Sequence, residues 1–163
     1  MRVFNRHSRK LQKSPEAVGK LLDSLASRSD GLWPHELWPR MAFDKPLGVG
    51  AKGGHGPIRY TVESYEPGRF VTFRFTSPKG FLGTHVFTVE EADGETELTH
   101  TIDMKVRGGA ILTWPMVFRP LHDALLEDAL DKAQASLGGG EWERRGWSTY
   151  VRSLRRLLAK RRR

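Results

Sequence analysis

The sequence predicts an α+β fold in which a run of antiparallel strands is followed by one long C-terminal helix. Three observations lead to this prediction. Apolar and polar residues alternate with a period of two from Ile58 to Val106, whereas apolar residues recur at three and four positions from Ile111 to Leu137. Ser14-Pro15-Glu16 is typical of a helix start. The 163 residues are enough for one domain with a continuous apolar core.

The first forty residues predict one strand and two short helices. Residues 3–11 have an extended pattern. A helix is expected from Ser14 to about Ala26, because its apolar residues form a single stripe: Ala17, Val18, Leu21, Leu22 and Leu25. Residues 32–39 contain two Trp-Pro steps, which suit a short helical turn or a bend, and residues 41–47 are expected to form a strand.

A glycine-rich segment, GVGAKGGHGPIRY at residues 48–60, has the spacing of a dinucleotide-binding turn at Gly48, Gly50 and Gly53. Such a turn needs a helix directly after it, because the helix N-terminus binds the pyrophosphate. Here Pro57 and an alternating strand pattern follow instead. We therefore expect a flexible connection between strands, not a phosphate site, with His55 exposed to solvent.

Two antiparallel hairpins are predicted between residues 58 and 106. The first pairs residues 58–62 with 71–75 around a turn at residues 66–69, and the second turns at Asp93-Gly94. This second turn pairs Phe87 with His100 and His85 with Ile102. His85 and His100 should therefore be diagonal neighbours on one face of the sheet.

The long helix is expected from about residue 111 to 137, with Leu121, Leu125, Ala129, Ala133 and Leu137 on one face. Pro115 and Pro120 should delay or kink its first turns. Three glycines at 138–140 should then end the helix and separate the body from the tail.

Composition excludes several classes of protein. With no cysteine, disulfides, thiolate catalysis, iron–sulfur clusters and cysteine-ligated zinc are all excluded. No segment has the length of apolar sequence that a signal peptide or a membrane span requires, so the expectation is a cytoplasmic protein. Residues 141–163 hold nine of the 27 Lys and Arg and two of the 19 Asp and Glu, which leaves 18 basic and 17 acidic residues in the body. The net charge of +8 therefore belongs mainly to the tail.

The order of these elements resembles the helix-grip fold of the START-related superfamily (SRPBCC), which includes pollen allergens, lipid-transfer START domains and polyketide cyclase/dehydrase-like proteins. The stretches that carry the resemblance are SPEAV, PLGVGAKGGHGPIRYTVESYEPGRFVTFRF, FLGTHVFTVEEADGETELTHTIDM and RPLHDALLEDAL. The resemblance implies a curved antiparallel sheet wrapped around the long C-terminal helix. It also implies a helix-grip ligand-binding domain at residues 1–137. Residues 138–163, a glycine-rich linker and a basic tail by their composition, depart from the family's pattern.

The resemblance further implies a cavity between the sheet and the last helix that binds a small hydrophobic or aromatic molecule, such as a lipid or a polyketide-like compound. The stretch GGHGPIRY, residues 53–60, resembles the glycine-rich loop that borders this cavity in the pollen-allergen branch. The side chains expected to line the cavity are Tyr60, Phe73, Phe75, His85, Phe87, His100, Met104, Trp114 and His122. A solid core is the alternative for the aromatic members of this set.

Histidines His85, His100 and His122 favour a polar pocket over a dry core, because an unpaired buried imidazole costs about 1–3 kcal/mol. They are also the candidate catalytic residues. As in the cyclase branch, one of them could act as a general base, with Asp123 or Asp103 as its orienting partner, although Asp103 should face outward. Zinc would require all three imidazoles to converge on one point, so no metal and no cofactor is expected. His7 and His35 carry no functional prediction.

The tail pattern predicts a basic amphipathic helix with Tyr150, Val151, Leu154, Leu157 and Leu158 along one side. Residues that would contact an anionic membrane surface, or less favourably nucleic acid, are Trp147, Arg152, Arg155, Arg156 and Lys160. The alternative is that the apolar edge packs on the body or on a second copy while the charges stay in solvent. The oligomeric state is left open.

Overall fold

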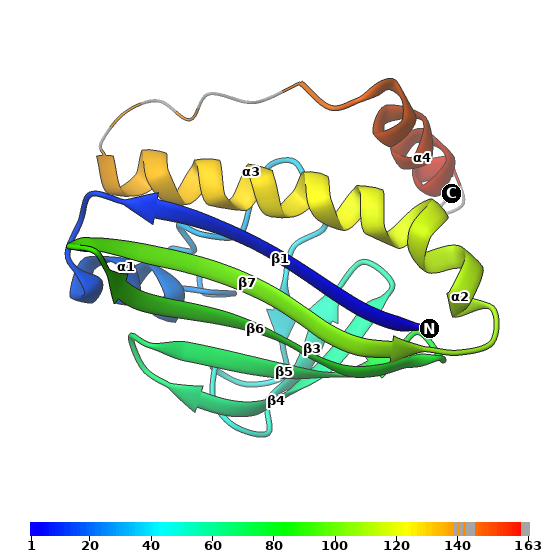
Figure 1. Cartoon of the computed structure of the whole chain (residues 1–163), viewed down its shortest axis with the longest axis horizontal. Coiled ribbons are helices and arrows are strands. Elements are labelled where there is room, and N and C mark those ends of the chain that lie inside the picture. The colour runs from blue at the N-terminus through cyan, green and yellow to red at the C-terminus, as the bar shows by residue number, and fades with distance from the viewer. Residues whose placement is uncertain (139, 141, 143–145, 161–163) are drawn as a thin grey trace.

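A curved antiparallel sheet lies against one long helix in the computed structural model of this protein (Figure 1). The structure describes residues 1–138, 140, 142 and 146–160, without the side chains of Ala92 and Lys160. Within these residues the sheet has seven strands in the order β1-β7-β6-β5-β4-β3-β2. Their bounds are β1 (Arg2–Leu11), β2 (Ala42–Phe43), β3 (Lys52–His55), β4 (Ile58–Glu66), β5 (Phe70–Ser77), β6 (Phe81–Ala92) and β7 (Glu95–Val106).

The helices of the described residues are α1 (Pro15–Asp23), α2 (Ala110–Thr113), the π-helix η1 (Trp114–Phe118), α3 (Arg119–Gly138) and α4 (Thr149–Lys160). This architecture confirms the predicted α+β helix-grip fold. Figure 1 shows α3 running along the sheet, with α4 on the side of α3 away from the sheet. None of the described helices is both long and apolar enough to cross a membrane.

Helix α1 starts where the sequence predicts and ends earlier. The Ser14 hydroxyl accepts the Ala17 N–H at 3.4 Å, as an N-cap does. The helix ends at Asp23 instead of about Ala26, because Ala26 adopts a left-handed φ of 62° and its N–H donates to the Asp30 carboxylate. The second expected short helix is one turn, in which Leu37 and Trp38 donate to the Pro34 carbonyl.

Both predicted hairpins form. The turn at residues 66–69 closes through the Arg69 N–H and the Glu66 carbonyl. The turn at Asp93-Gly94 sets the register of β6 and β7, in which Phe87 lies opposite His100 and His85 opposite Ile102. This register is the predicted one, because two left-handed residues at 93 and 94 leave a two-residue connection between the strands.

The glycine-rich segment corrects two expectations. The strand expected at 41–47 shrinks to β2 (Ala42–Phe43), and residues 52–55 of the supposedly flexible connection form β3. Glycine is needed here for close approach. A Cβ at Gly53 would clash with the Ala42 carbonyl oxygen, and one at Gly54, where φ is 150°, would clash with the Ile58 carbonyl oxygen. No helix follows β3, so this segment lacks the geometry of a dinucleotide turn, as expected.

The start of the long helix is irregular, as the two prolines predict. Pro115 lies in η1 and Pro120 in the first turn of α3. Proline lacks the N–H that an α-helix needs at each interior position, so the helical hydrogen-bond pattern is interrupted there. The predicted break at the three glycines agrees with the end of α3 at Gly138, while Gly139 lies outside the described residues.

The core lies between the concave face of the sheet and α3. Strand residues contribute alternate side chains to it, because successive side chains in a strand point to opposite faces. The buried apolar side chains of this layer include Val62, Val71, Phe73, Phe87, Leu98, Ile102 and Met104 from the sheet and Leu125, Leu126, Ala129, Leu130 and Ala133 from α3.

Candidate functional site

The candidate site is a group of histidines on the concave face of the sheet and the facing side of α3. β1 and β7 pair so that His7 lies opposite His100. His85 comes from β6 and His122 from α3. Ring centroids are 5.2 Å apart from His85 to His100 and 5.1 Å from His100 to His122. The three histidines predicted from sequence therefore lie side by side.

His85 and His100 are joined by a direct hydrogen bond of 3.0 Å between Nδ1 of His85 and Nε2 of His100. Their side chains are 5% and 2% exposed. A bond between two neutral imidazoles needs one N–H and one lone pair, so the two tautomers are coupled. Whichever ring donates, the outer nitrogens, His85 Nε2 and His100 Nδ1, must present one donor and one acceptor. Neither outer nitrogen has a hydrogen-bond partner among the described residues.

Aromatic rings enclose this pair. Phe73 and Phe75 stack on the His85 ring, each with its ring centroid 4.8 Å from that of His85. The Tyr60 ring contacts His85 edge-on at a centroid distance of 4.8 Å. Phe87 lies 4.5 Å from His100. Of the other predicted lining residues, Met104 and Trp114 are buried, and Trp114 lies 6.2 Å from His122. Strand alternation and register thus place the predicted strand residues on the concave face of the sheet, where Phe75 is only partly buried. Trp114 and His122 reach the same interior from η1 and α3.

Burial keeps these groups neutral. Desolvation, helped by the charges of neighbouring histidines, holds the pKa values of His85 and His100 well below the usual 6.5. Burial also raises the pKa of Tyr60 well above 10. The Tyr60 hydroxyl has no hydrogen-bond partner among the described residues. The interior therefore presents uncharged donors and acceptors within aromatic surroundings.

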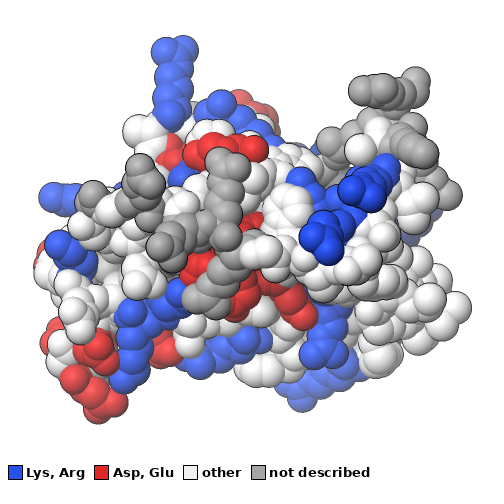
Figure 2. All heavy atoms as spheres, turned by 90° about the horizontal axis from the view of Figure 1, so that it is seen from above, with Lys and Arg blue, Asp and Glu red and all other residues white. Residues whose placement is uncertain are grey.

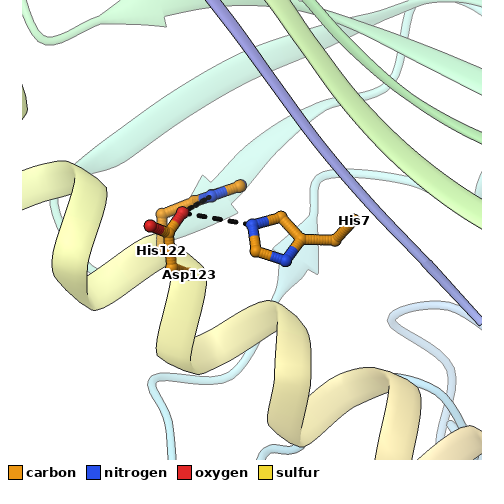
Figure 3. Close-up of side chains that lie close together, drawn as sticks. All are labelled: His7, His122 and Asp123. Atoms are coloured by element: carbon orange, nitrogen blue, oxygen red, sulfur yellow. Dashed lines mark hydrogen bonds and ion pairs between the residues drawn. The ribbon is translucent and has the colours of Figure 1, made fainter. Parts of the chain in front are cut away.

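His122 links this interior to a charged group at the edge of the sheet (Figure 3). Nδ1 of His122 lies 3.7 Å from Oδ1 of Asp123, and the same oxygen contacts Nε2 of His7 at 3.1 Å and accepts from Asn5 at 3.0 Å. These contacts lower the pKa of Asp123. Hydrogen bonds to Asp123 and Glu127 raise the pKa of His7, although burial opposes them.

One histidine near the site, His7, was assigned no role from the sequence, and the exposure of another, His55, was predicted wrongly. His7 carried no prediction, yet it lies between α3 carboxylates on the concave face, and its place in the alternation of β1 was the signal available. His55 was expected to be exposed. It is partly buried instead, 4.7 Å from Trp33 and 6.0 Å from Tyr60, and burial lowers its pKa to about 3. The reason is that β3 is part of the sheet.

A cluster of polar and aromatic side chains, separate from the histidines, attaches the described part of the tail to the body. The sequence did not indicate this cluster. Asp128 is 2% exposed and accepts indole N–H bonds from Trp38 at 2.7 Å and Trp147 at 2.8 Å. The Arg155 guanidinium lies over both rings, 4.1 Å from Trp38 and 4.0 Å from Trp147, and donates to the Leu37 carbonyl. We refer to Trp38, Asp128, Trp147 and Arg155 as the tail anchor.

The tail anchor changes which tail residues face solvent. Trp147 and Arg155, both expected to contact a membrane or nucleic acid, point toward the body. Arg152 and Arg156 are exposed, while the Lys160 side chain lies outside the description. Figure 2 looks onto this side of the molecule and shows acidic side chains near its middle beside basic ones, so the face carries a mixture of charges.

Comparison with known proteins supports the fold. No protein-family model and no curated protein matches the sequence. Among solved structures, the chain is similar to a Thermobifida fusca protein at a TM-score of 0.64 and 13% identity, over 87% of this chain and 97% of that one. CalU16 from Micromonospora echinospora aligns at a TM-score of 0.56 and 13% identity, over 98% of this chain and 84% of its own.

A third similar structure is DynU16, a protein of the dynemicin biosynthetic locus, with a TM-score of 0.57 and 16% identity over 89% of this chain. This chain spans about half of DynU16, 51% of its length. Identities this low establish a shared fold. They leave the chemistry to the residues of the site.

Proposed function

We propose that this protein binds a small aromatic or otherwise apolar molecule that also carries hydrogen-bonding groups, between the concave face of the sheet and α3. The observation that carries the proposal is the set of buried polar atoms without hydrogen-bond partners among the described residues: Tyr60 Oη, His85 Nε2, His100 Nδ1 and both ring nitrogens of His122. Each unpaired atom lowers the free energy of unfolding by about 1–3 kcal/mol. Five such atoms would cancel much of the stability of a typical domain.

The chemistry of the interior indicates what such a molecule would need. The aromatic rings of Phe73, Phe75 and Phe87 favour a flat apolar body. The coupled imidazoles supply one donor and one acceptor, and the Tyr60 hydroxyl supplies either. A hydroxylated aromatic or polyketide-like compound meets these requirements better than a plain lipid chain, which would leave every polar atom unpaired.

Membership of the START-related superfamily is part of this proposal, as is the cytoplasmic location expected from composition. The helix-grip fold and the similarity to DynU16, a protein of a biosynthetic locus, support a role in handling a small molecule. The fold alone supports carriers and enzymes equally.

The test has two parts. Native mass spectrometry of the protein purified from cells should detect a bound small molecule, released on denaturation. Binding of 2-naphthol and of naphthalene should then be compared by fluorescence. We expect 2-naphthol to bind several-fold more tightly, because one extra hydrogen bond contributes about 0.5–1.5 kcal/mol.

The variant His85→Leu should remove the preference for 2-naphthol and leave naphthalene binding within a factor of about three. His35→Gln, which changes an exposed histidine, is the matched control and should bind as the unaltered protein does. Absence of saturable binding of both compounds, together with no co-purified molecule, would show that the histidines are only core residues.

A second candidate is a polyketide cyclase/dehydrase-like enzyme, which the His85–His100 hydrogen bond favours. Two coupled neutral imidazoles can take a proton at one outer nitrogen and release one at the other, which is general acid–base chemistry. His100→Gln should then reduce turnover of the co-purified molecule or its precursor by ~100-fold or more, whereas a carrier would show no protein-dependent conversion at all.

The tail supports a separate and weaker proposal, contact with an anionic membrane surface. Tyr150 and Leu157 are exposed apolar residues of α4, and Arg152 and Arg156 are exposed basic residues of the same helix. Sedimentation with phosphatidylserine vesicles should be lost in Leu157→Asp and weakened by salt. Equal binding of this variant and the unaltered protein would contradict the proposal, as would exclusive binding to nucleic acid.

A further inference from the structure

We propose that His7, His122 and Asp123 form a binding site for a divalent transition-metal ion, with zinc as the reference ion. One nitrogen from each imidazole and one carboxylate oxygen lie within 4.8 Å of one another, at the junction of β1 and α3 (Figure 3). Two imidazoles and one carboxylate are a common ligand set for such ions. This trio differs from the three histidines that the sequence brought forward, of which only His122 belongs to it.

The distances between these groups are close to those between ligands of one ion. Ligands about 2.1 Å from one ion lie roughly 3.0–3.5 Å from their neighbours in tetrahedral or octahedral geometry. Oδ1 of Asp123 is 3.1 Å from Nε2 of His7 and 3.7 Å from Nδ1 of His122. Rotation of the His122 ring would bring its Nδ1 closer to the Asp123 oxygen. Apart from this 3.7 Å ion-pair contact, both ring nitrogens lack a hydrogen-bond partner among the described residues.

The surroundings of His7 are those of a metal ligand. Its Nδ1 lies 2.9 Å from the Glu127 carboxylate and its Nε2 hydrogen-bonds Asp123 at 3.1 Å. An ion placed between His7 and Asp123 would replace the Nε2 proton, while Nδ1–H still donates to Glu127. Arg9 in turn holds Glu127 at 3.1 Å. A carboxylate that fixes the tautomer and orientation of a histidine is a recurrent support of metal sites. Here Arg9, Glu127 and His7 make such a chain from the strand to the ion.

Charge also favours a cation at this place. Asp123 and Glu127 supply two carboxylates within reach of His7, and Asn5 donates to the Asp123 oxygen from the strand side. Arg119 is the basic side chain nearest to Asp123 on α3, with its Nε 3.7 Å from Oδ2, and it is largely exposed. Three protein ligands leave coordination positions for water or for a group on a bound molecule.

The experiment uses the full chain without a histidine tag, dialysed against EDTA and titrated with zinc chloride by calorimetry. One equivalent of zinc should bind, with a Kd in the micromolar range or tighter. His122→Gln and Asp123→Ala should weaken binding by 100-fold or more. Glu127→Gln, which removes only the orienting carboxylate of His7, should weaken it by about 10–100-fold.

Matched controls separate this site from the other histidines. His35→Gln removes an exposed imidazole beside Glu36, and His85→Leu removes one from the aromatic interior; both should bind zinc as the unaltered protein does. Zinc binding that is absent, or that survives unchanged in His122→Gln and Asp123→Ala, would overturn the proposal.

A second readout needs no substitution in the site, in case a variant fails to fold. Imidazole nitrogen resonances of the unaltered protein should move on zinc addition for His7 and His122 and stay in place for His35. Cobalt(II) should give ligand-field absorption bands that zinc abolishes. Shifts confined to His35 or to His85 and His100 would assign the metal elsewhere and refute the site.

The zinc experiments can succeed or fail separately from the test of small-molecule binding. Loss of zinc binding in Asp123→Ala with retained 2-naphthol binding would support the metal site alone. The reverse pattern, in which zinc never binds while 2-naphthol does, would remove the metal site and leave the interior site standing.

Discussion

Two charged residues of α3, Asp128 and Lys132, are almost fully buried, and each is satisfied by a different set of partners. Asp128 holds the two indole N–H groups of the tail anchor. Lys132 is 7% exposed and donates to the backbone carbonyls of Asp30 and Trp33 and to the carboxylate of Glu36. Buried charges are tolerated only when paired in this way. Both residues therefore have a structural role, which is to attach the segment 30–38 to α3.

Lys132→Met should destabilise the protein by about 2–4 kcal/mol, because two buried carbonyls and the Glu36 carboxylate lose their donor. Urea unfolding followed by circular dichroism measures the change. Lys105→Met, at an exposed position of β7, should alter stability by less than about 0.5 kcal/mol. Equal stability of the two variants would mean that the Lys132 contacts contribute nothing net.

At the scale of elements, β3 depends on glycine because three backbone segments approach closely there. Gly54→Ala should cost about 1–3 kcal/mol, since its Cβ would meet the Ile58 carbonyl and its φ of 150° disfavours a side chain. Gly109→Ala is the control, because a Cβ there meets nothing within 4 Å. Thermal unfolding should separate the two, and a loss confined to Gly109→Ala would contradict this account of the segment.

The tail anchor makes a prediction about α4. Trp147→Ala removes the Asp128 hydrogen bond and one face of the Arg155 stack, contacts worth about 1–3 kcal/mol together. Amide exchange in residues 149–160 should become about 10–100-fold faster, while exchange in β6 and β7 stays unchanged. Arg152→Ala, which removes an exposed side chain, should change neither. Unaltered exchange in Trp147→Ala would show that other contacts hold α4.

At the scale of the whole molecule, the buried histidines make stability depend on pH. The pKa values of His55, His85 and His100 are lowered in the folded state, so below about pH 6.5 the unfolded chain binds protons that the folded chain does not. The free energy of unfolding therefore decreases as the pH decreases below about 6.5, by up to about 1.4 kcal/mol per pH unit for each of these three histidines. His7, whose pKa is raised, opposes this by at most one proton.

We expect the protein to unfold in acid, because each histidine that stays neutral in the folded protein lowers its stability further as the pH falls below about 6.5. The double variant His85→Leu/His100→Leu should unfold at a lower pH, whereas His35→Gln should follow the unaltered protein. Fluorescence during acid titration measures the midpoints. An unchanged midpoint in the double variant would mean that these histidines are not neutral in the folded protein.

Local pattern was enough to determine the elements of this protein and part of its site. Alternation assigned Tyr60, Phe73 and His85 to one face, and the Asp93-Gly94 turn set the register that brings His85 beside His100. Both depend on neighbours in sequence or on one short turn, so the sequence determined the α+β order, the hairpins and the inner face of the sheet.

Contacts between distant segments were decided only by the tertiary structure. His7 meets Asp123 because β1 pairs with β7 under α3, which joins residues more than a hundred positions apart. Trp38, Asp128 and Trp147 likewise converge from three segments, which turns a predicted surface arginine, Arg155, toward the body. Periodicity reports which way a side chain points from its own element. Which partner it meets there depends on how the elements pack.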